Sequence, residues 1–297
     1  MSAVAQDAAA SVERVGVLGF GTIGAGVAHV AAGAGCSVTV LGTDGSHLDA
    51  GFARLDRFLA RGVSAGDTSD AEASELRGRI TGATDPSALA AAQLVIEAVS
   101  EELDAKHAVL SRVTSLLGPD ALVATTTSTL SVTSLAAAVP DPARFGGLHF
   151  FDPAPLTRLV EVVAAEQSSP ETLERLQAFV RRAGKTPVVV KDRPGFLVNR
   201  LLTPYLNQAV QALDDGVATA EDIDRSVRLG LGYPMGPLEL LDLIGLDVHL
   251  RTTTAVYEQL LATPFTPPPM LERLVAAGRT GRKAGSGFFE HREEGQQ

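Results

Sequence analysis

The sequence is short of several residue types, and each shortage narrows what the chain can do. It has one cysteine, Cys36, among 297 residues, no tryptophan, and 5% aromatic residues. A single cysteine excludes an internal disulfide framework and predicts a reducing compartment, which we take to be the cytoplasm. Cys36 opens a predicted strand, where a small buried hydrophobic residue is the expected role.

Basic residues are also in deficit, with 25 Lys and Arg against 35 Asp and Glu and a formal net charge of −10. Nucleic acid is excluded as a partner, because its backbone requires a basic surface. No apolar run approaches the ~20 residues of a membrane-spanning helix, so no membrane partner is expected. Met1–Ser11 lacks the features of a signal peptide, and we expect a disordered tail over residues 1–13. No metal site is predicted.

What the sequence does have is a series of short apolar runs that alternate with helical stretches up to residue 192. Several runs lack polar residues, as strands covered on both faces do. This βαβ series predicts an α/β fold of Rossmann type, with a doubly wound, mainly parallel sheet. The predicted strands are Arg14–Leu18, Ser37–Leu41, Leu94–Glu97, Leu122–Thr125, Phe145–Phe150, Leu159–Val163 and Pro187–Val190. The predicted helices between them include Thr22–Gly33, Ser46–Gly62 and Glu102–Leu117.

Beyond Asp192 the pattern is helical throughout. The predicted helical stretches are Phe196–Leu213, Glu221–Leu229, Pro237–Leu261 and Met270–Ala277. We therefore predict two domains, a dinucleotide-binding Rossmann domain over residues 14–192 and an all-helical domain over residues 193–297.

A glycine-rich loop follows the first predicted strand, with Gly19, Gly21 and Gly24 in the pattern G-x-G-x-x-G. The first glycine permits a tight turn, the second lets a pyrophosphate approach the backbone, and the third lets the helix pack on the strand. The helix that begins with Thr22 and Ile23 would offer its N-terminus to the anion. Between a strand and a helix of a βαβ unit, this motif predicts a dinucleotide site.

The acidic residue expected at the end of the second strand is missing. Gly42 stands there, and Asp44 lies two residues further on, where it can take over the ribose contact. The alternative is that the open space admits the 2′-phosphate of NADP. Since no Lys or Arg occurs between Gly24 and Gly51 to bind that phosphate, NAD is the predicted cofactor, with NADP not excluded.

His149 differs from the other five histidines because it ends a predicted strand, on the side where open α/β sheets bind ligands. Glu161 lies twelve residues later among β-branched residues, where an unpaired carboxylate would be costly. If the two strands are neighbours, the carboxylate increases the basicity of the imidazole, as a general base requires. From spacing alone, a structural His–Glu pair and a catalytic pair are equally good readings.

Two further polar residues and one basic cluster are candidates for ligand binding. Ser128 follows a strand and either binds ligand or caps the next helix. Asn199 lies within an apolar stretch, and a mid-helix Asn suggests a position facing a site. Three arginines, Arg54, Arg57 and Arg61, share one face of a predicted helix; that face is either simply solvated or an anchor for a phosphorylated substrate handle.

Taken in order, these motifs closely resemble those of L-3-hydroxyacyl-CoA dehydrogenases, including the short-chain 3-hydroxybutyryl-CoA dehydrogenases. The resemblance runs from Val15 to Phe289. The matching segments are Gly19–Gly24, Val95–Ala98 with Glu101 and Lys106, Leu148–Pro155, Leu159–Val162, Pro194–Arg200, Pro234–Leu240, Gly281–Lys283 and Gly285–Phe288.

The resemblance implies a reversible oxidation of a 3-hydroxyacyl thioester to the 3-oxo form, with hydride passing to nicotinamide. It assigns His149 as the base, Glu161 as its partner, and Ser128 and Asn199 as substrate-binding groups. It also implies a homodimer formed through the helical domain of residues 193–297, which contributes to substrate binding as well. The predicted cofactor-binding residues are Gly19, Gly21, Thr22, Ile23, Gly24, Asp44, Glu101 and Lys106.

Three residues depart from the family pattern: Gly42, Thr126 where an Asn is usual, and Asp152 where another Asn is usual. They suggest a specialised substrate. A close alternative is the same chemistry on an acyl-carrier-protein thioester or on a free hydroxy acid. A second alternative, a binding or structural protein without turnover, is disfavoured because all four catalytic positions are present.

Overall fold

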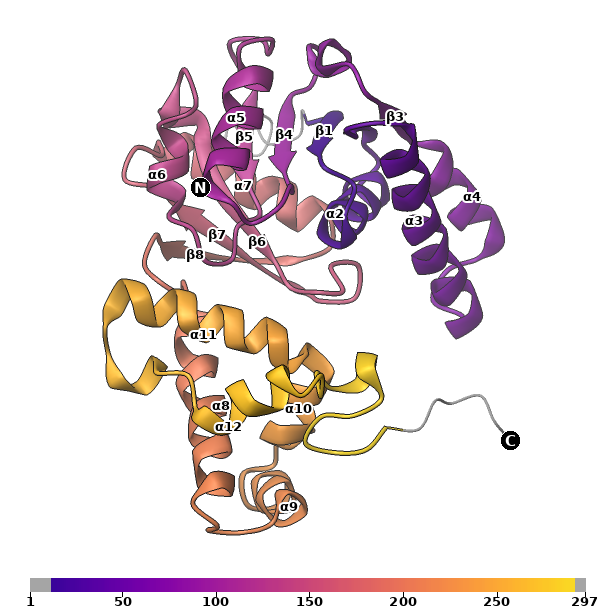
Figure 1. Cartoon of the computed structure of the whole chain (residues 1–297). Helices are drawn as coiled ribbons and strands as arrows, with labels where there is room; N and C mark the ends of the chain where they lie inside the picture. The colour runs from indigo at the N-terminus through magenta and orange to yellow at the C-terminus, as the bar shows by residue number, and fades with distance from the viewer. Residues whose placement is uncertain (1–11, 292–297) are drawn as a thin grey trace. The chain divides into compact units, whose positions relative to one another are not determined.

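The computed structural model describes residues 12–291, which form two compact units divided between Arg193 and Pro194 (Figure 1). Of the tail predicted for residues 1–13, residues 1–11 lie outside the described part. Val12 does not fit that prediction, since it is buried in the core of the first unit. Its carbonyl accepts hydrogen bonds from the Cys36 thiol and from the Arg182 guanidinium.

The first unit is built on a sheet of eight strands in the order β3-β2-β1-β4-β5-β6-β7-β8. The strands are β1 (Arg14–Leu18), β2 (Ser37–Leu41), β3 (Ile80–Ala83), β4 (Leu94–Glu97), β5 (Leu122–Thr125), β6 (Phe145–Phe150), β7 (Leu159–Ala164) and β8 (Thr186–Lys191). All neighbouring pairs are parallel except β6 with β7. The predicted Rossmann-type, mainly parallel sheet is confirmed, and β3 is the strand that the sequence analysis missed.

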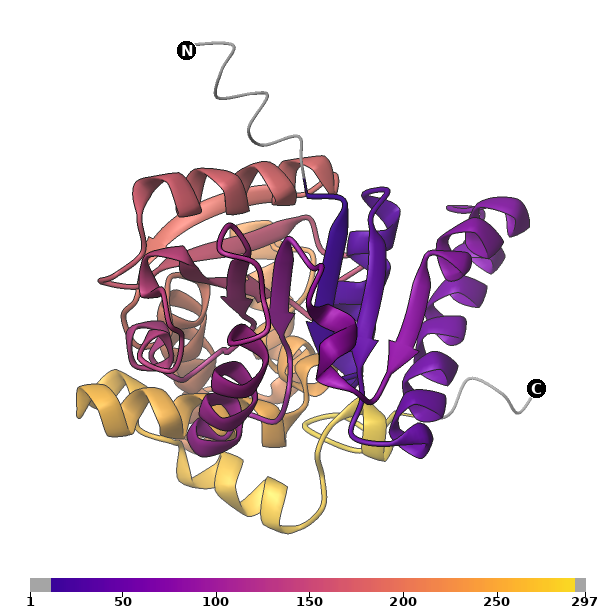
Figure 2. The same cartoon turned by 90° about the horizontal axis from the view of Figure 1, so that it is seen from above.

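Helices cover both faces of this sheet (Figure 2). The helical elements are α2 (Thr22–Gly33), α3 (Gly45–Ala65), α4 (Asp70–Gly78), η1 (Pro86–Leu89), α5 (Leu103–Thr114), α6 (Val132–Ala136), η2 (Pro142–Arg144) and α7 (Pro170–Arg182). Two adjacent glycines of β6 show the alternation: a Cβ on Gly146 would meet Leu176 of α7, whereas one on Gly147 would meet Val132 of α6. The main core lies between the sheet and α2, α3 and α7.

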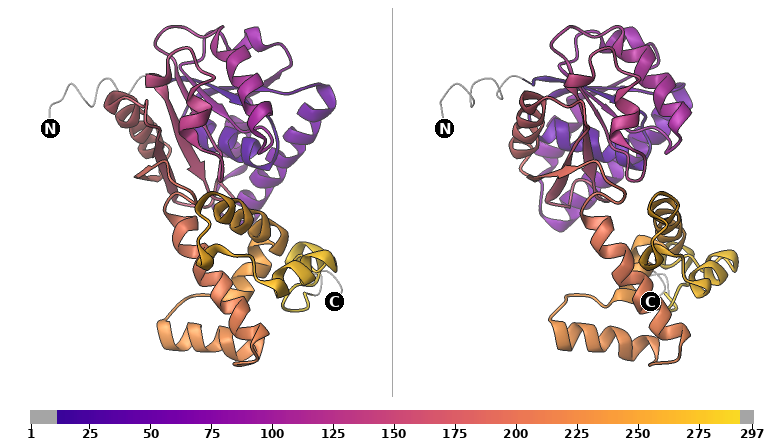
Figure 3. Two further views of the ribbon diagram at one scale, coloured as in Figure 1. Left: turned by 60° about the vertical axis from the view of Figure 1, so that its left-hand side comes forward. Right: turned by 90° about the vertical axis from the view of Figure 1, so that its left-hand side faces the viewer.

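The second unit is helical, as predicted. Its elements are α8 (Val198–Asp214), α9 (Ala220–Leu231), α10 (Pro237–Ile244), α11 (Leu246–Leu260), η3 (Thr263–Phe265), α12 (Pro269–Ala276) and η4 (Arg282–Ala284). α10, α11 and α12 pack against α8 (Figure 3), around a core that includes Leu206, Leu238 and Leu271. Among the helices of residues 12–291, none has the length and apolar character needed to cross a membrane.

One helix predicted in this unit is two. The stretch Pro237–Leu261 breaks at Gly245, which has φ +100° and separates α10 from α11. A Cβ on Gly245 would lie 3.1 Å from Asp247 Oδ1 and 3.3 Å from Lys283 Nζ. Because this backbone conformation favours glycine, the chain turns here although the apolar periodicity continues across the break.

A buried polar network joins α8 to α11 inside the second unit. The side-chain amide of Asn207 donates to Thr253 Oγ1 (2.8 Å) and to the carbonyls of Pro264 and Thr266, while its oxygen accepts from His249 Nε2 (2.9 Å). Since the amide nitrogen donates, the amide oxygen must accept, and His249 therefore carries its proton on Nε2. Burial lowers the pKa of His249 to about 4.

This lowered pKa predicts acid sensitivity of the second unit. In the unfolded chain, His249 binds a proton below about pH 6.5, whereas in the folded chain it does so only near pH 4. The stability that depends on neutral His249 is therefore complete above about pH 6.5 and is lost as the pH falls to about 4. The full loss is roughly 3 kcal/mol. We expect His249→Gln to lose less free energy of unfolding than the parent between about pH 7.5 and about pH 5, measured by urea denaturation. Equal losses would contradict the prediction, and His107→Gln is the matched control.

Candidate active site

The glycine loop has the backbone that a bound pyrophosphate requires. Gly19 has φ +92°, and a Cβ there would lie 2.8 Å from the carbonyl oxygen of Ala98; a Cβ on Gly24 would lie 2.2 Å from the carbonyl oxygen of Gly19. On Gly21, by contrast, a Cβ would enter open space. Within the described residues, no side chain caps α2 at its N-terminus and no acidic residue lies in its first turn. The first-turn amides, including those of Thr22 and Ile23, thus suit an anion.

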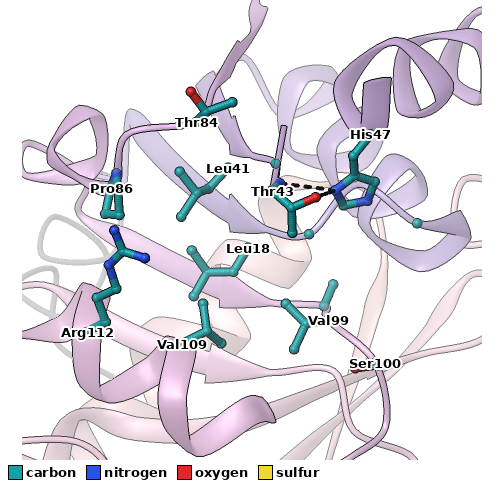
Figure 4. Close-up of a pocket in the computed structure, with 14 residues that line it drawn as sticks. Leu18, Leu41, Thr43, His47, Thr84, Pro86, Val99, Ser100, Val109 and Arg112 are labelled. Carbon is teal, nitrogen blue, oxygen red and sulfur yellow. Dashed lines mark hydrogen bonds between the residues drawn. The ribbon is translucent and has the colours of Figure 1, made fainter. Parts of the chain in front are cut away.

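A cavity of about 500 Å³ lies beside this loop (Figure 4). Its lining includes Gly19 and Gly21 of the loop, Leu18 and Leu41 at the ends of two neighbouring strands, and Val99 after β4. The carboxyl ends of parallel strands are where open α/β sheets bind dinucleotides. An apolar floor with a glycine-lined edge fits the adenosine and pyrophosphate of such a cofactor.

Several residues that line this cavity were not predicted from the sequence. Thr43 and His47 lie on one side, where the His47 ring accepts from the Thr43 amide (3.3 Å), and Arg112 of α5 lies on the other (Figure 4). Arg112 has no distinguishing signal in the sequence, because α5 reads as an ordinary amphipathic helix. The structure therefore supplies a cation that the stretch between Gly24 and Gly51 lacks.

Asp44 does not line the cavity. Its carboxylate is the N-cap of α3 and accepts from the Ser46 hydroxyl (2.6 Å), the His47 amide (2.8 Å) and the Thr43 hydroxyl (3.1 Å). These hydrogen bonds, led by that of Ser46, lower the pKa of Asp44 to about 2. The ribose contact predicted for Asp44 stays a prediction, while its charge beside the cavity is a feature of the structure.

Gly42 also lines the cavity, and the side chain of Leu48 lies where a side chain on Gly42 would begin. A Cβ on Gly42 would lie 2.7 Å from both Cγ and Cδ2 of Leu48, and one on Gly82 would lie 3.1 Å from the same Cδ2. Leu48 packs against the main core. The space that a side chain at position 42 would use is therefore taken up by Leu48.

His149 and Glu161 face each other across the antiparallel pair of β6 and β7. Nδ1 of His149 lies 2.7 Å from Oε2 of Glu161, and the two side chains are 4% and 0% exposed. An ionised carboxylate only accepts, so it fixes the imidazole proton on Nδ1 and leaves Nε2 as the basic nitrogen. Such an arrangement suits proton transfer coupled to hydride transfer.

The loop that carries Ser128 follows β5, the strand next to β6, at the same edge of the sheet. Glu101 holds this loop: its Oε1 accepts from the Ser128 amide (2.8 Å), the Thr127 hydroxyl (2.6 Å), and the amide and hydroxyl of Thr129 (both 3.0 Å). Ser131, not Ser128, caps the following helix. The capping role considered for Ser128 is thus wrong.

Lys106, predicted to bind cofactor, is 1% exposed. Its ammonium lies 2.8 Å from Glu97 Oε1, 3.3 Å from Glu101 Oε2 and 3.3 Å from the Val99 carbonyl oxygen. Glu97 and the Val99 carbonyl accept hydrogen bonds from it, and Glu101 forms a second ion pair with it. Lys106 is therefore part of the scaffold around the site, and direct contact with a cofactor does not follow from its position.

Asn199 belongs to the second unit, whereas the other three members of the predicted quartet belong to the first. It is the second residue of α8, because the preceding Phe196 has φ +46° and the helix begins at Val198. The mid-helix position inferred from the sequence is therefore wrong.

The three arginines lie on α3, outside the cavity. Arg57 and Arg61 are exposed, and half-buried Arg54 donates to the carbonyl of Phe20 (3.3 Å). Across residues 12–291, no group of three or more His, Cys, Asp or Glu side chains is arranged to hold a metal ion.

Two family models together match most of the chain. The model of the 3-hydroxyacyl-CoA dehydrogenase NAD binding domain matches residues 14–193, and that of the 3-hydroxyacyl-CoA dehydrogenase C-terminal domain matches residues 195–291. The cofactor is accordingly NAD, in agreement with the glycine loop and the cavity.

Individual proteins of known name match over nearly the same length. A 3-hydroxybutyryl-CoA dehydrogenase of Bradyrhizobium diazoefficiens is 40% identical over 96% of this chain and 97% of its own. A 3-hydroxyadipyl-CoA dehydrogenase of Escherichia coli is 41% identical over 96% of this chain and 60% of its own. The crystal structure of Mycobacterium tuberculosis FadB2 superposes with a TM-score of 0.92 at 40% identity, covering 95% of this chain and 99% of that one. With these matches, a glycine loop after β1 and a His–Glu pair across β6 and β7, the chain belongs to the 3-hydroxyacyl-CoA dehydrogenase family.

Proposed function

We propose that the chain oxidises the 3-hydroxyl of 3-hydroxyacyl-CoA thioesters with His149 as the base. Nε2 of His149 takes the hydroxyl proton while the hydrogen on C3 leaves as hydride and the C3–O bond becomes a carbonyl. Bound NAD supplies the acceptor for that hydride. In the reverse direction the imidazolium returns the proton to the carbonyl oxygen. The observation that carries the proposal is the buried 2.7 Å contact between His149 and Glu161.

The supporting residues have distinct proposed roles. Glu161 stabilises the imidazolium and fixes the orientation of the ring. Ser128 and Asn199 are substrate-binding groups, as the family resemblance assigns them. Arg54, Arg57 and Arg61 stay candidates for the phosphates of CoA, because arginines on one face of a helix suit phosphate groups.

The experiment that tests the proposal follows the absorbance of NADH with acetoacetyl-CoA as the acceptor. Acetoacetyl acyl carrier protein and free acetoacetate serve as parallel substrates, and 3-oxoadipyl-CoA tests a longer acid acyl group. Turnover with a CoA thioester supports the proposal. Turnover confined to the carrier-protein thioester or the free acid would replace it with the corresponding alternative, and no turnover with any substrate would contradict it.

We further propose that the second unit forms a homodimer interface. Several large apolar side chains of this unit are exposed, among them Leu201 (67%), Leu229 (80%) and Leu231 (62%). Exposed apolar side chains in such numbers suit burial against a second copy. Light scattering of the purified chain tests this, and a monomer at micromolar concentration would contradict it. A cytoplasmic location stays a prediction from the single cysteine.

Cofactor discrimination gives a further prediction. Asp44 is an ionised residue bonded to Thr43 and His47, which line the cavity, and we expect its charge to oppose the 2′-phosphate of NADP. Asp44→Asn removes the charge but keeps a good N-cap. The ratio of kcat/KM for NADH to that for NADPH is expected to fall roughly threefold or more.

Asp49→Asn, on the same helix and away from the cavity, is the matched control for this change. An unchanged ratio in Asp44→Asn would show that Asp44 has no part in cofactor choice. A parent ratio that already favours NADPH would overturn the premise.

A further inference from the structure

Glu101 gathers an unusual number of donors on one atom. Its Oε1 accepts two amides and two hydroxyls, all from the three consecutive residues Thr127, Ser128 and Thr129. The bond from Ser128 comes from its backbone, so it places the residue and does not engage its hydroxyl. A carboxylate that accepts several charge-assisted hydrogen bonds holds its donors tightly. The conformation of this loop is therefore set by a residue from the end of the neighbouring strand.

The second carboxylate oxygen of Glu101 is held by a buried ion-pair network. Its Oε2 lies 3.3 Å from the ammonium of Lys106, which in turn lies 2.8 Å from Oε1 of Glu97. Oε2 of Glu97 accepts from the Thr125 hydroxyl (2.6 Å), and the Thr125 oxygen accepts from the Thr127 amide (3.2 Å). The loop is therefore hydrogen-bonded directly to Glu101 and, through Thr125, to Glu97.

Burial and charge make each member of this network costly to remove. Glu97 and Lys106 are 0% and 1% exposed, so neither has water as a substitute partner. Burial raises the pKa of Glu101, but Lys106 and the hydrogen bonds from the loop outweigh it and hold that pKa below its usual value. Glu101 therefore stays ionised at neutral pH, and removing any one member leaves a charge or a donor without its partner.

We infer that Glu101 is the positioning residue for Ser128, and that the buried Lys106–Glu97 pair anchors Glu101 for that task. This gives Glu101 a role in acyl-substrate binding, with Lys106 as its anchor, beside the cofactor role predicted from the family resemblance. The inference rests on the proposed function of Ser128 as a substrate-binding residue.

A double-mutant cycle tests the inference in the full-length chain. Glu101→Gln keeps the size of the side chain, removes its charge, and leaves one acceptor oxygen to share among the donors. We expect kcat/KM for acetoacetyl-CoA, measured at saturating NADH, to fall roughly tenfold or more. In a Ser128→Ala background the same change is expected to cost less than about twofold, because the group being positioned is already gone.

Two further variants accompany the cycle. Glu102→Gln alters the neighbouring acidic residue, whose side chain makes no capping hydrogen bond to α5, and is expected to behave as the parent. Thr129→Val removes one donor hydroxyl without touching the carboxylate, and we expect a smaller loss in the same direction. It keeps the test valid if Glu101→Gln fails to fold.

The outcomes separate the inference from the function beneath it. If Ser128→Ala alone leaves kcat/KM unchanged, the proposed role of Ser128 fails, and the inference fails with it. If Ser128→Ala is defective but Glu101→Gln costs the same factor in both backgrounds, the inference alone fails. A Kd for NADH raised tenfold or more by Glu101→Gln, with an unchanged kcat/KM for acetoacetyl-CoA at saturating NADH, would leave Glu101 with the cofactor role alone.

Discussion

Replacing His149 with Asn is expected to lower kcat for acetoacetyl-CoA reduction roughly 10²–10⁴-fold, the range typical of losing a general acid or base. Asn is polar and close in shape, and its side-chain amide can still donate to Glu161, so the change removes the titrating group with little effect on packing. The Kd for NADH should stay within about twofold of the parent. Stopped-flow reduction measures the first quantity and fluorescence titration the second.

His107→Asn is the matched control for this change, because His107 lies on α5 and bonds only a backbone carbonyl among the described contacts. A His149 variant within threefold of the parent would remove His149 from the mechanism. A loss of NADH binding as large as the loss of rate would point to a misfolded edge of the sheet.

Replacing Glu161 with Gln should lower kcat roughly 10–10³-fold by withdrawing the charge that stabilises the imidazolium. Glu161 is fully buried, and the amide oxygen of Gln can still accept from Nδ1 of His149, so the ring orientation survives. Because the imidazolium is disfavoured without its carboxylate, neutral imidazole persists to lower pH. The pH–rate profile of the oxidation should therefore move to lower pH.

Rates measured from about pH 5.5 to about pH 9.5 with matched buffers test both parts of this expectation. A slower enzyme with an unmoved profile would mean that Glu161 orients the ring without stabilising its charge. An unchanged rate and an unchanged profile together would make Glu161 a structural residue.

The strands were predictable where burial on both faces leaves an uninterrupted apolar run. Leu94–Glu97 and Phe145–Phe150 match the structure to the residue. β3 escaped because Ile80–Ala83 is an edge strand with exposed residues at its centre, so it carries no such signal. The one helix predicted over Pro237–Leu261 was wrong because a single glycine redirects the backbone without interrupting the apolar pattern.

The site residues that could be predicted from the sequence are those carried by neighbouring strands. The spacing of His149 and Glu161 suggested neighbouring strands, and the antiparallel register places them opposite each other. The spacing of residues along the sequence does not show in which direction a long side chain points. Lys106 was assigned to the cofactor but turns inward to Glu97, whereas Arg112 was unremarkable in the sequence and lines the cavity.

The packing of Leu48 against Gly42 bears on how this chain can change over time. The family's usual acidic residue at position 42 would require Leu48 to move, because its first side-chain carbon would lie 2.7 Å from Cγ and Cδ2 of that partly buried leucine. Truncating Leu48 first would remove apolar contacts with the core and would also cost stability. Each single substitution is therefore expected to lower stability, although a variant that combines both can be stable. A library that varies positions 42 and 48 at the same time would find such combinations.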